Sequence, residues 1–295
     1  MYPVVYLTNA ASTSNLGILN ITPDSFSDGG AFLRPEDALA RAKQMLSEGA
    51  DVIDVGGESS RPAGGDYGEG STQVDEAEEL RRVIPVIRAL RSELGATISI
   101  DTVKAQVAQQ ALEAGASIVN DVSCAANDEL LSLVAEKQVH YVLMHNRADG
   151  KVAGENASYS HVAAQVCDEL QQGVERCLSK GIEQNKLWLD PGLGFAKSAE
   201  ATVDILAKLT DVVSLGYPVL LGHSRKSFIA RVSADANGKK PEPSRRMSAG
   251  AVVTAWGYWA GAQAIRTHDV FETRQAMCMA SALSERLDVE RMLLQ

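Results

Sequence analysis

Short runs of apolar, mostly β-branched residues recur along the chain. The eight runs are LGILN (16–20), DVIDV (51–55), TISID (97–101), SIVND (117–121), HYVLM (140–144), LWLD (187–190), PVLLG (218–222) and AQAIR (262–266). Longer stretches with apolar residues at helical spacing lie between them, for example at 35–50, 74–94 and 105–115. The pattern predicts strands that alternate with amphipathic helices.

This alternation is typical of a parallel sheet whose strands are connected by helices. Eight strand–helix units favour an α/β fold of the closed (β/α)8 TIM barrel type, which commonly uses about 250 residues as one domain. An open, doubly wound sheet shares the alternation and differs in strand order, which a sequence does not reveal. We expect a single barrel domain over residues 16–295, preceded by an N-terminal extension over residues 1–15.

Polar residues follow most of the predicted strands. They are Asn20, Asp101, Asn120, Asp121, His145, Asp190, Arg266 and His268. In a parallel barrel the C-terminal ends of all strands open on one face, so these side chains are expected to converge on one pocket. Each Asn or Asp could instead cap the helix that follows it. Capping explains one or two such residues better than the whole series, so the pattern favours a functional site.

Two segments rich in small residues interrupt the alternation. The first, GGESSRPAGGDYGEGS (56–71), has the composition of a flexible interdomain linker. Because it lies between a strand and an amphipathic helix, we interpret it as a long loop on the catalytic face. The second, SADANGKKPEPS (233–244), is interpreted as a solvated excursion before the last helix–strand pair.

Composition and charge restrict the possible functions. A net charge of −10 and a pI near 5.1 argue against binding to nucleic acid or to an anionic membrane surface. The four cysteines form no C-x-x-C pair, which argues against a zinc site and a disulfide framework. No apolar run approaches the roughly 20 residues of a membrane span, and the N-terminal segment lacks the features of a signal peptide. We therefore expect a cytoplasmic protein.

Seven longer motifs follow one another along the chain. They are GILNITPDSFSDGG (17–30), GGESSRPAG (56–64), SIDT (99–102), VND (119–121), DPGLGF (190–195), SRKSF (224–228) and IRTHDV (265–270). In this order they resemble the signatures of the dihydropteroate synthase family. The resemblance implies a pterin-binding barrel that condenses a dihydropterin diphosphate with p-aminobenzoate, giving dihydropteroate and diphosphate in folate biosynthesis. It also implies a homodimer that uses Mg²⁺ and is inhibited by sulfonamides, which mimic p-aminobenzoate.

The resemblance assigns the pterin pocket to five residues. A pterin edge presents N–H donors beside carbonyl and ring-nitrogen acceptors, so a specific pocket needs carboxylates together with an amide or an ammonium group. By resemblance, this set is Asp101, Asn120, Asp190 and Lys226. The guanidinium group of Arg266 is expected to stack on the ring face, which Lys would do less well. Taken alone, each Asp could equally be a helix cap or half of a surface ion pair.

The resemblance also assigns residues to the diphosphate and to the metal ion. Ser60, Arg61, Arg266 and His268 are expected to bind the departing diphosphate, whose charges must be neutralised. Asn20 offers a hard carbonyl oxygen to Mg²⁺, an ion that normally keeps several waters and binds substrate phosphates. From the residues alone, Asn20 could simply cap the loop that follows it.

The mechanism implied by the resemblance is ionisation of the bond between the pterin methylene and the diphosphate. The aniline nitrogen of p-aminobenzoate then attacks the resulting cation, which anionic Asp101 stabilises. The residues expected to act in catalysis are Asp101, Lys226, Arg266 and His268.

The second substrate needs a slot for a flat ring and an anchor for its carboxylate. By resemblance, Phe26, Asp28, Pro62 and Phe195 surround p-aminobenzoate, and Ser227 at a helix start binds its carboxylate. The two loops that carry Phe26, Asp28 and Pro62 would close over the site and exclude water. Phe26 and Phe195 could instead be ordinary core residues.

Some features depart from the family pattern or allow other interpretations. Ser60 stands where Thr is usual, so sensitivity to sulfonamides stays open. Lys226 could be the Schiff-base lysine of an aldolase barrel. A non-catalytic pterin-binding module is a third possibility, although the SRKSF and IRTHDV motifs argue against it. The histidines at 140, 145, 161 and 223 lack the spacing of common zinc sites and are interpreted as structural.

Overall fold

A computed structural model describes residues 13–22, 34–58, 74–147 and 158–286 of the chain. Its strands are β1 (Ser14–Asn20), β2 (Val52–Gly56), β3 (Ile98–Asp101), β4 (Ile118–Asp121), β5 (His140–Met144), β6 (Leu187–Asp190), β7 (Leu220–Gly222) and β8 (Ala264–Thr267). Its helices are α1 (Pro35–Ser47), α2 (Glu76–Leu94), α3 (Ala105–Ala114), α4 (Asp128–Lys137), α5 (Val162–Ser179), α6 (Ala199–Ala207), α7 (Leu209–Val213), α8 (Ser227–Val232), α9 (Met247–Trp259) and α10 (Val270–Ser284). Two 3₁₀ turns, η3 (Gln184–Lys186) and η4 (Pro243–Arg245), complete the described elements.

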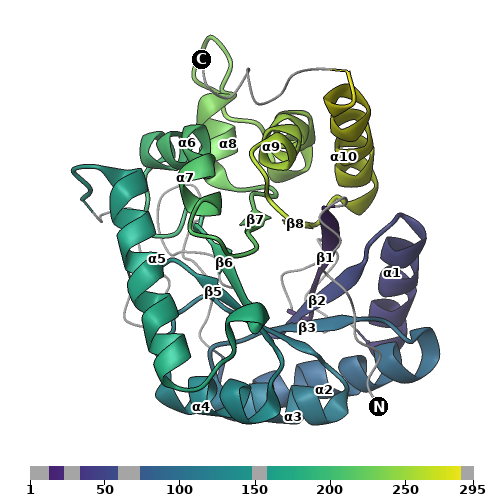
Figure 1. Cartoon of the computed structure of the whole chain (residues 1–295). Coiled ribbons are helices and arrows are strands. Elements are labelled where there is room, and N and C mark those ends of the chain that lie inside the picture. The colour runs from purple at the N-terminus through teal and green to yellow at the C-terminus, as the bar shows by residue number, and fades with distance from the viewer. Residues whose placement is uncertain (1–12, 23–33, 59–73, 148–157, 287–295) are drawn as a thin grey trace.

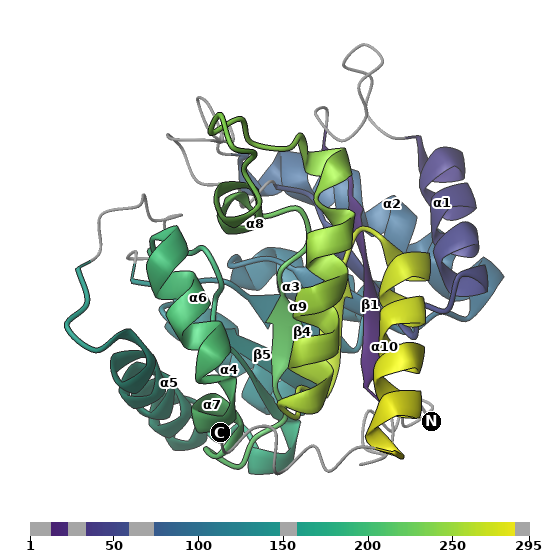
Figure 2. The same ribbon diagram turned by 90° about the horizontal axis from the view of Figure 1, so that it is seen from above.

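The strands form an eight-stranded parallel barrel. They are hydrogen-bonded in the order β6-β5-β4-β3-β2-β1-β8-β7. A parallel bridge between Leu189 and Val219 joins the two ends of this order, and the amide of Leu189 donates to the carbonyl of Pro218 at 2.8 Å. The helices surround the strands (Figure 1), and α1 and α10 run beside β1 (Figure 2). This arrangement confirms the predicted TIM barrel.

Side chains alternate between the barrel interior and the helix layer along each strand. Seven apolar side chains form a separate cluster inside the barrel: Leu16, Val52, Ile118, Val142, Trp188, Leu220 and Ala264. The intervening residues, such as Ile53, Ile100 and Leu189, belong to a larger cluster that includes buried residues of the helices. Most of the hydrophobic stabilisation therefore comes from packing between the strands and the helices.

The helix starts use residues other than the polar ones that end the strands. Asn127 caps α4, and Ser198 caps α6 by accepting from the amide of Ala201. Lys104 is the N-cap residue of α3 and makes no side-chain capping bond. Asp101, Asn120 and Asp190 are consequently not helix caps, and the capping interpretation of these residues is wrong.

The predicted elements agree with the observed ones to within about two residues at most ends. β5 and β6 have the predicted bounds, whereas β7 begins at Leu220, two residues later than predicted. β1 begins at Ser14, so it includes two residues assigned to the N-terminal extension. Residues 1–12 lie outside the described part of the chain, and the extension stays a prediction. The same holds for most of the Gly-rich loop, because residues 59–73 are also outside it.

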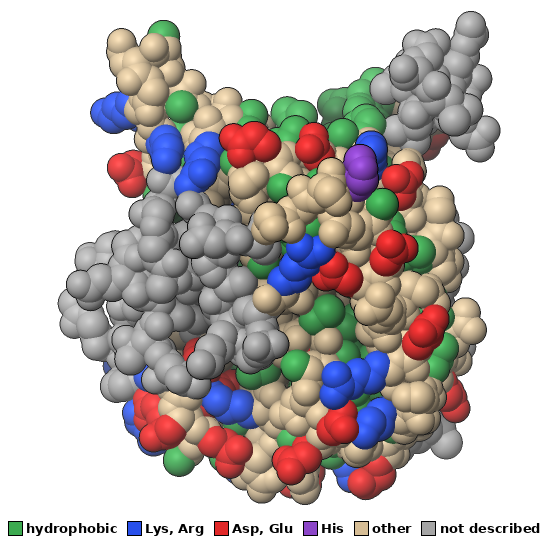
Figure 3. All heavy atoms as spheres, turned by 90° about the vertical axis from the view of Figure 1, so that its left-hand side faces the viewer, with side chains coloured by type: hydrophobic (Ala, Val, Ile, Leu, Met, Phe, Trp, Pro, Cys, Tyr) green, Lys and Arg blue, Asp and Glu red, His purple; other side chains and the backbone are tan. Residues whose placement is uncertain are grey.

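The surface of the barrel carries charges of both signs. On the side where α5 lies in Figure 1, basic and acidic side chains are interspersed (Figure 3). Arg176 and Lys180 of this side both pair with Asp128, at 2.6 and 2.8 Å. Among the described helices, none has the length and apolar character needed to cross a membrane.

Candidate active site

A polar layer lies inside the barrel directly beyond the apolar layer. Asp54, Asn120, Asp190 and Arg266 each follow a residue of the inner apolar cluster by two positions and so point into the same interior. Asp101 ends β3, where it is in register with Gly56 on one side and Asn120 on the other. The three acids and the amide are buried. Burying several charges together is costly unless they pair, so this layer indicates a site rather than a structural core.

Arg266 is held between two carboxylates at the centre of this layer. Its Nε donates to Oδ2 of Asp54 and its Nη2 donates to Oδ2 of Asp101, both at 2.6 Å. Burial disfavours the charge on Arg266, but the two carboxylates outweigh burial and raise the pKa of the guanidinium group above its usual value. Arg266 is therefore a permanent cation with a fixed orientation.

Asp101 is the residue of this group whose charge is least stable. Burial raises its pKa to about 7; the attraction of Arg266 opposes this, while the charge of Asp54 adds to it. The charged form of such a carboxylate is strongly stabilised by any positive charge that develops nearby. The polar layer is thus suited to stabilising a cation.

Asp190 and Lys226 form a second charged group beside Arg266. Oδ1 of Asp190 accepts from the amide of Gly192 at 2.7 Å, and Nζ of Lys226 donates to the carbonyl of Leu193 at 2.6 Å. A Cβ atom on Gly222 would lie 3.5 Å from Oδ2 of Asp190 and 3.9 Å from Cβ of Arg266. The missing side chain at Gly222 therefore brings these two residues close together.

Lys226 also faces an aromatic ring. Its Nζ lies 4.6 Å from the centroid of the Phe195 ring, within the range of a cation–π contact. Burial lowers the pKa of Lys226 to about 8, and the charge of Arg266 contributes in the same direction against the opposing effect of Asp190. Phe195 is buried but belongs to neither apolar cluster of the barrel. The ring therefore faces Lys226 rather than packing in either of these apolar clusters.

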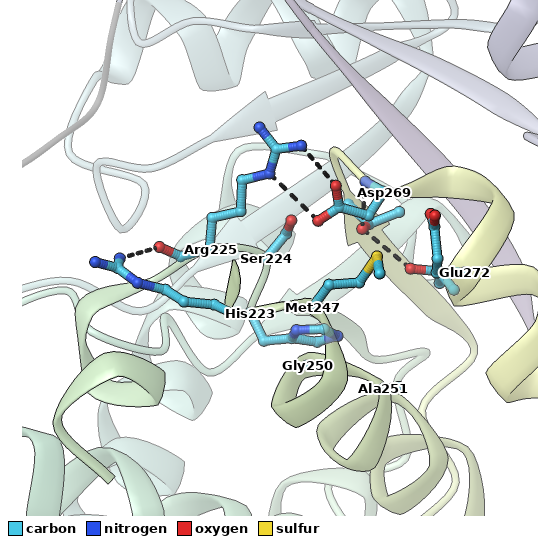
Figure 4. Close-up of a pocket in the computed structure, with 11 residues that line it drawn as sticks. His223, Ser224, Arg225, Met247, Gly250, Ala251, Asp269 and Glu272 are labelled. Atoms are coloured by element: carbon cyan, nitrogen blue, oxygen red, sulfur yellow. Dashed lines mark hydrogen bonds and ion pairs between the residues drawn. The ribbon is translucent and has the colours of Figure 1, made fainter. Parts of the chain in front are cut away.

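The turn after β7 brings His268 toward the same face. Oγ of Ser224 accepts from the amide of His268 at 3.1 Å and lies 3.1 Å from its Nδ1. Arg225, in a left-handed conformation with φ 59°, pairs with Asp269 at 2.6 Å (Figure 4). Ser227 is the first residue of α8 and is nearly buried. Hydrogen bonds and an ion pair thus connect the segments that follow β7 and β8, at a position where an anion could bind.

Asn20 lies at the end of β1, next to Asp101. A Cβ atom on Gly56 would be 3.3 Å from Oδ1 of Asn20 and 3.9 Å from Oδ2 of Asp101. Asn20 is partly exposed, and its side-chain carbonyl oxygen is the type of ligand atom that hard cations such as Mg²⁺ prefer. This position fits a ligand to a divalent cation that also binds water and substrate.

The structure brings together most of the predicted site residues that it describes. They are Asn20, Asp101, Asn120, Asp190, Phe195, Lys226, Ser227, Arg266 and His268. Phe26, Asp28, Ser60, Arg61 and Pro62 lie outside the described residues.

Two of the polar residues that end strands do not join the pocket. Asp121 points to the outer face of β4, where its carboxylate accepts from the hydroxyl of Tyr141. His145 contacts Lys197 and Glu169 instead. Their neighbours in sequence, Asn120 and Met144, occupy the inward positions because side chains alternate along a strand. For these two, the expected convergence on one pocket is wrong.

Asp54 is the site residue that sequence reasoning missed. It stands inside the apolar run DVIDV, whereas the predicted site residues were those at or after the strand ends. The signal was present nevertheless, since a carboxylate in the middle of a fully buried strand is rare without a partner. Its partner, Arg266, is 212 positions away in the sequence.

The geometry agrees with comparisons to known proteins. The model of the family described as "Pterin binding enzyme" matches residues 16–268. The chain belongs to this family. Among curated pterin-binding relatives, the dihydropteroate synthase of Mycobacterium leprae is 42% identical over 269 residues, which cover 90% of this chain and 92% of the relative.

Solved structures of pterin-binding enzymes share the fold. Dihydropteroate synthase from Clostridium difficile, solved in the presence of pteroic acid, is 40% identical with a TM-score of 0.82, covering 93% of this chain and 97% of that one. The Xanthomonas albilineans enzyme with 4-aminobenzoic acid is 37% identical with a TM-score of 0.83, covering 94% and 95%. The Yersinia pestis enzyme with a sulfonamide drug complex is 36% identical with a TM-score of 0.85, covering 95% and 97%.

Proposed function

We propose that this chain is an enzyme of folate biosynthesis that synthesises dihydropteroate. It joins 6-hydroxymethyl-7,8-dihydropterin diphosphate to p-aminobenzoate and releases diphosphate. The observation that carries the proposal is the buried Asp54–Arg266–Asp101 group, placed beside Asn120 and Asp190. This arrangement can bind a pterin and stabilise positive charge on it. The relatives' names and their complexes with pteroic acid and 4-aminobenzoic acid support the same reaction.

The pterin binds across the polar layer in this proposal. The carboxylates of Asp101 and Asp190 accept from the ring and amino N–H groups, while Asn120 and Lys226 donate to the ring nitrogen and carbonyl acceptors. Arg266 stacks on the ring face, a role that suits a guanidinium group already oriented by two carboxylates. Because these groups are fixed before the substrate arrives, little reorganisation is needed.

The reaction proceeds by ionisation of the bond between the pterin methylene carbon and the diphosphate oxygen. The electron pair leaves with diphosphate, and the positive charge spreads into the ring beside anionic Asp101. Arg266 and His268, with Ser60 and Arg61, bind the departing diphosphate. The aniline nitrogen of p-aminobenzoate then attacks the methylene carbon and loses a proton.

The second substrate lies against Phe195 and the stem of Lys226. Its carboxylate is bound by Ser227 and amide groups at the start of α8. Phe26, Asp28 and Pro62 close the site over it. Phe195 and Lys226 already contact each other at 4.6 Å, so one wall of this slot is preformed.

Mg²⁺ is the cofactor in this proposal. Asn20 would hold it through Oδ1, since this oxygen lies beside Asp101 at the rim of the polar layer. When bound, the ion neutralises charge on the diphosphate. Arg266, on the neighbouring strand β8, contributes positive charge, and His268 lies in the turn that follows this strand.

We also propose a homodimer that works in the cytoplasm and is inhibited by sulfonamides. The eight most exposed large apolar side chains among the described residues include five on α9 and α10: Met247, Val252, Phe271, Met279 and Leu283. Paired helices with such faces are typical of an interface between copies. The four cysteines are free, which suits a reducing compartment. The complex of the Yersinia pestis relative with a sulfonamide drug supports the inhibitor class.

Replacing Asp101 by Asn tests the proposed role of this carboxylate. We expect turnover to fall by about 100-fold or more, because the amide cannot stabilise the developing cation. The free energy of unfolding should not decrease. Burial raises the pKa of Asp101 to about 7, so the ionised carboxylate destabilises the folded state at pH 8. The neutral amide of Asn removes this cost. Steady-state kinetics and thermal unfolding at pH 8 check both results.

The control is Asp128→Asn, which removes an exposed carboxylate paired with two cations. It should leave turnover unchanged. Full turnover in the Asp101→Asn variant would rule out the role assigned to Asp101.

A further inference from the structure

Lys197 is a buried lysine that the proposed reaction does not use, and burial lowers its pKa to about 7. It lies two residues beyond the motif DPGLGF and is 3% exposed. Its ammonium group is held by uncharged acceptors: Nδ1 of His145 at 2.8 Å, the carbonyl of Gly192 at 2.9 Å and the carbonyl of Phe195 at 2.9 Å. A lysine is seldom buried in this way without a function, since the cost of desolvation is large.

The backbone carbonyl of His145 is a fourth acceptor of this group, at a longer distance of 3.5 Å. The ionised carboxylate of Glu169 can only accept, so Nε2 of His145 carries the ring hydrogen and donates to Glu169 at 3.0 Å, which leaves Nδ1 to accept from Lys197. Burial lowers the pKa of His145 to about 4, and the charge of Lys197 acts in the same direction, so the ring is neutral. Glu169 is in turn bound by Arg147, at 2.5 Å from Nη2. The result is a chain of contacts from the surface to the loop after β6.

The loop after β6 depends on these contacts for its shape. Gly192 has φ +65°, Gly194 has φ +77° and Ala196 has φ 49°, which makes three left-handed conformations within five residues. Inside the loop, the amide of Phe195 donates to the carbonyl of Gly192 at 3.0 Å. Lys197 binds the carbonyls at both ends of this turn and so fixes its width. Lys226 binds Leu193 from the side of the site.

We propose that Lys197 is a positioning residue that fixes the loop after β6 so that Phe195 is in place for p-aminobenzoate. The inference rests on the proposed location of p-aminobenzoate beside Phe195. Asp190 ends β6 and is held by the sheet and by the amide of Gly192. Loss of Lys197 should therefore affect the second substrate more than the pterin. The advantage is preorganisation, because an ordered loop does not have to be immobilised on binding.

The test compares Lys197→Met with Lys43→Met, which removes an exposed charge from α1. In Lys197→Met we expect KM for p-aminobenzoate to rise about tenfold, while the dissociation constant of the pterin changes by about twofold or less. Amide exchange in the segment 192–196 should become faster. Lys43→Met should show none of these effects. An unchanged KM for p-aminobenzoate in folded Lys197→Met would overturn the proposal.

Two further variants keep the test decisive. Glu169→Gln, at a partly exposed position, weakens the orientation of His145 without touching the core, and should raise the same KM by a smaller factor. If Lys197→Met does not fold, Glu169→Gln replaces it in the test, and an unchanged KM for p-aminobenzoate in Glu169→Gln then overturns the proposal. Phe195→Ala tests the underlying placement. If Phe195→Ala leaves KM for p-aminobenzoate unchanged, the placement of that substrate fails; if it raises KM while Lys197→Met does not, the positioning role alone fails.

Discussion

At the residue scale, the central feature of the molecule is how it makes buried charges tolerable. Asp54 and Asp101 share Arg266, and all three side chains are largely removed from water. Two carboxylates paired with one guanidinium group leave a net negative charge. Asp101 bears most of the energetic cost of this buried charge, because burial raises its pKa to about 7. A positive charge that develops on a bound pterin would relieve this cost. The ground-state arrangement is thus complementary to a cation that forms during the reaction.

The charge states of Asp101 and Lys226 predict a narrow pH optimum for pterin binding. Asp101, with a pKa of about 7, loses its charge as the pH falls through 7. Lys226, with a pKa of about 8, loses its charge as the pH rises through 8. The affinity for 6-hydroxymethyl-7,8-dihydropterin should therefore peak between these values. We expect a fall of about tenfold per pH unit on either side, measured by fluorescence titration.

This ligand carries no phosphate, so the titration of diphosphate does not contribute to the profile. In Asp101→Asn, the affinity for the pterin should no longer fall at low pH but should still fall at high pH. A constant affinity from pH 5.5 to 9 would show that neither group titrates in this range or that neither binds the ring.

The positions of site residues could be predicted from sequence where a polar group follows a strand. Asp101, Asn120 and Asp190 were found in this way, because the end of a barrel strand is a known location for function. Asp54 was missed because its environment comes from Arg266, far away in sequence. Asp121 was misplaced because its side chain is on the outward side of β4, a parity that the VND motif alone does not fix. Which residues form ion pairs, and which way a side chain points from its strand, depend on the fold rather than on a motif.

At the element scale, the loop after β6 depends on a glycine. A Cβ atom on Gly192 would lie 2.0 Å from the carbonyl oxygen of His145, and φ is +65°. Gly192→Ala should therefore shift the loop, lower the free energy of unfolding by about 3 kcal/mol or more, and reduce activity. Denaturant unfolding and steady-state kinetics measure the two effects.

Gly95 provides a matched control for this prediction. It has φ +59°, but a Cβ atom there would meet nothing within 4 Å. Gly95→Ala should cost about 1 kcal/mol, from backbone strain alone, and leave activity intact. Equal losses of stability in the two variants would show that the contact with His145 is unimportant.

The elements themselves were largely predictable because hydrophobic period reflects local geometry. Strands buried on both faces read as short apolar runs, and the helices read as amphipathic stretches. The exact strand ends were less predictable. β7 lacks the first two residues of the run PVLLG, since Val219 forms an isolated bridge with Leu189. Such an end depends on pairing with another strand, which lies beyond a local pattern.

At the scale of the whole molecule, closure of the barrel was not determined by the alternation. The bridge between β6 and β7 and the pairing of β1 with β8 close it, and both join strands whose order a sequence does not reveal. The resemblance of the motifs to a known family supplied what the pattern did not. The inner apolar cluster then explains why the interior is filled at one end and polar at the other.

The exposed apolar residues of α9 and α10 provide a test of the proposed homodimer. Val252 is 70% exposed and Met279 is 63% exposed. The double variant Val252→Glu, Met279→Glu should be a monomer in sedimentation velocity, because charges at the centre of an apolar interface are strongly unfavourable. The matched control is Leu178→Glu on α5, where an apolar side chain is 39% exposed. This control should remain a dimer; a dimeric double variant would place the interface elsewhere.

The most direct test of the proposed function is product formation by the purified protein. The protein is incubated with 6-hydroxymethyl-7,8-dihydropterin diphosphate and p-aminobenzoate, with and without Mg²⁺, and both dihydropteroate and diphosphate are measured. We predict equal amounts of the two products, formed in the presence of Mg²⁺ and greatly reduced without it. If the pterin binds but no dihydropteroate forms, the chain is a pterin-binding module rather than a synthase, and the proposed condensation is contradicted.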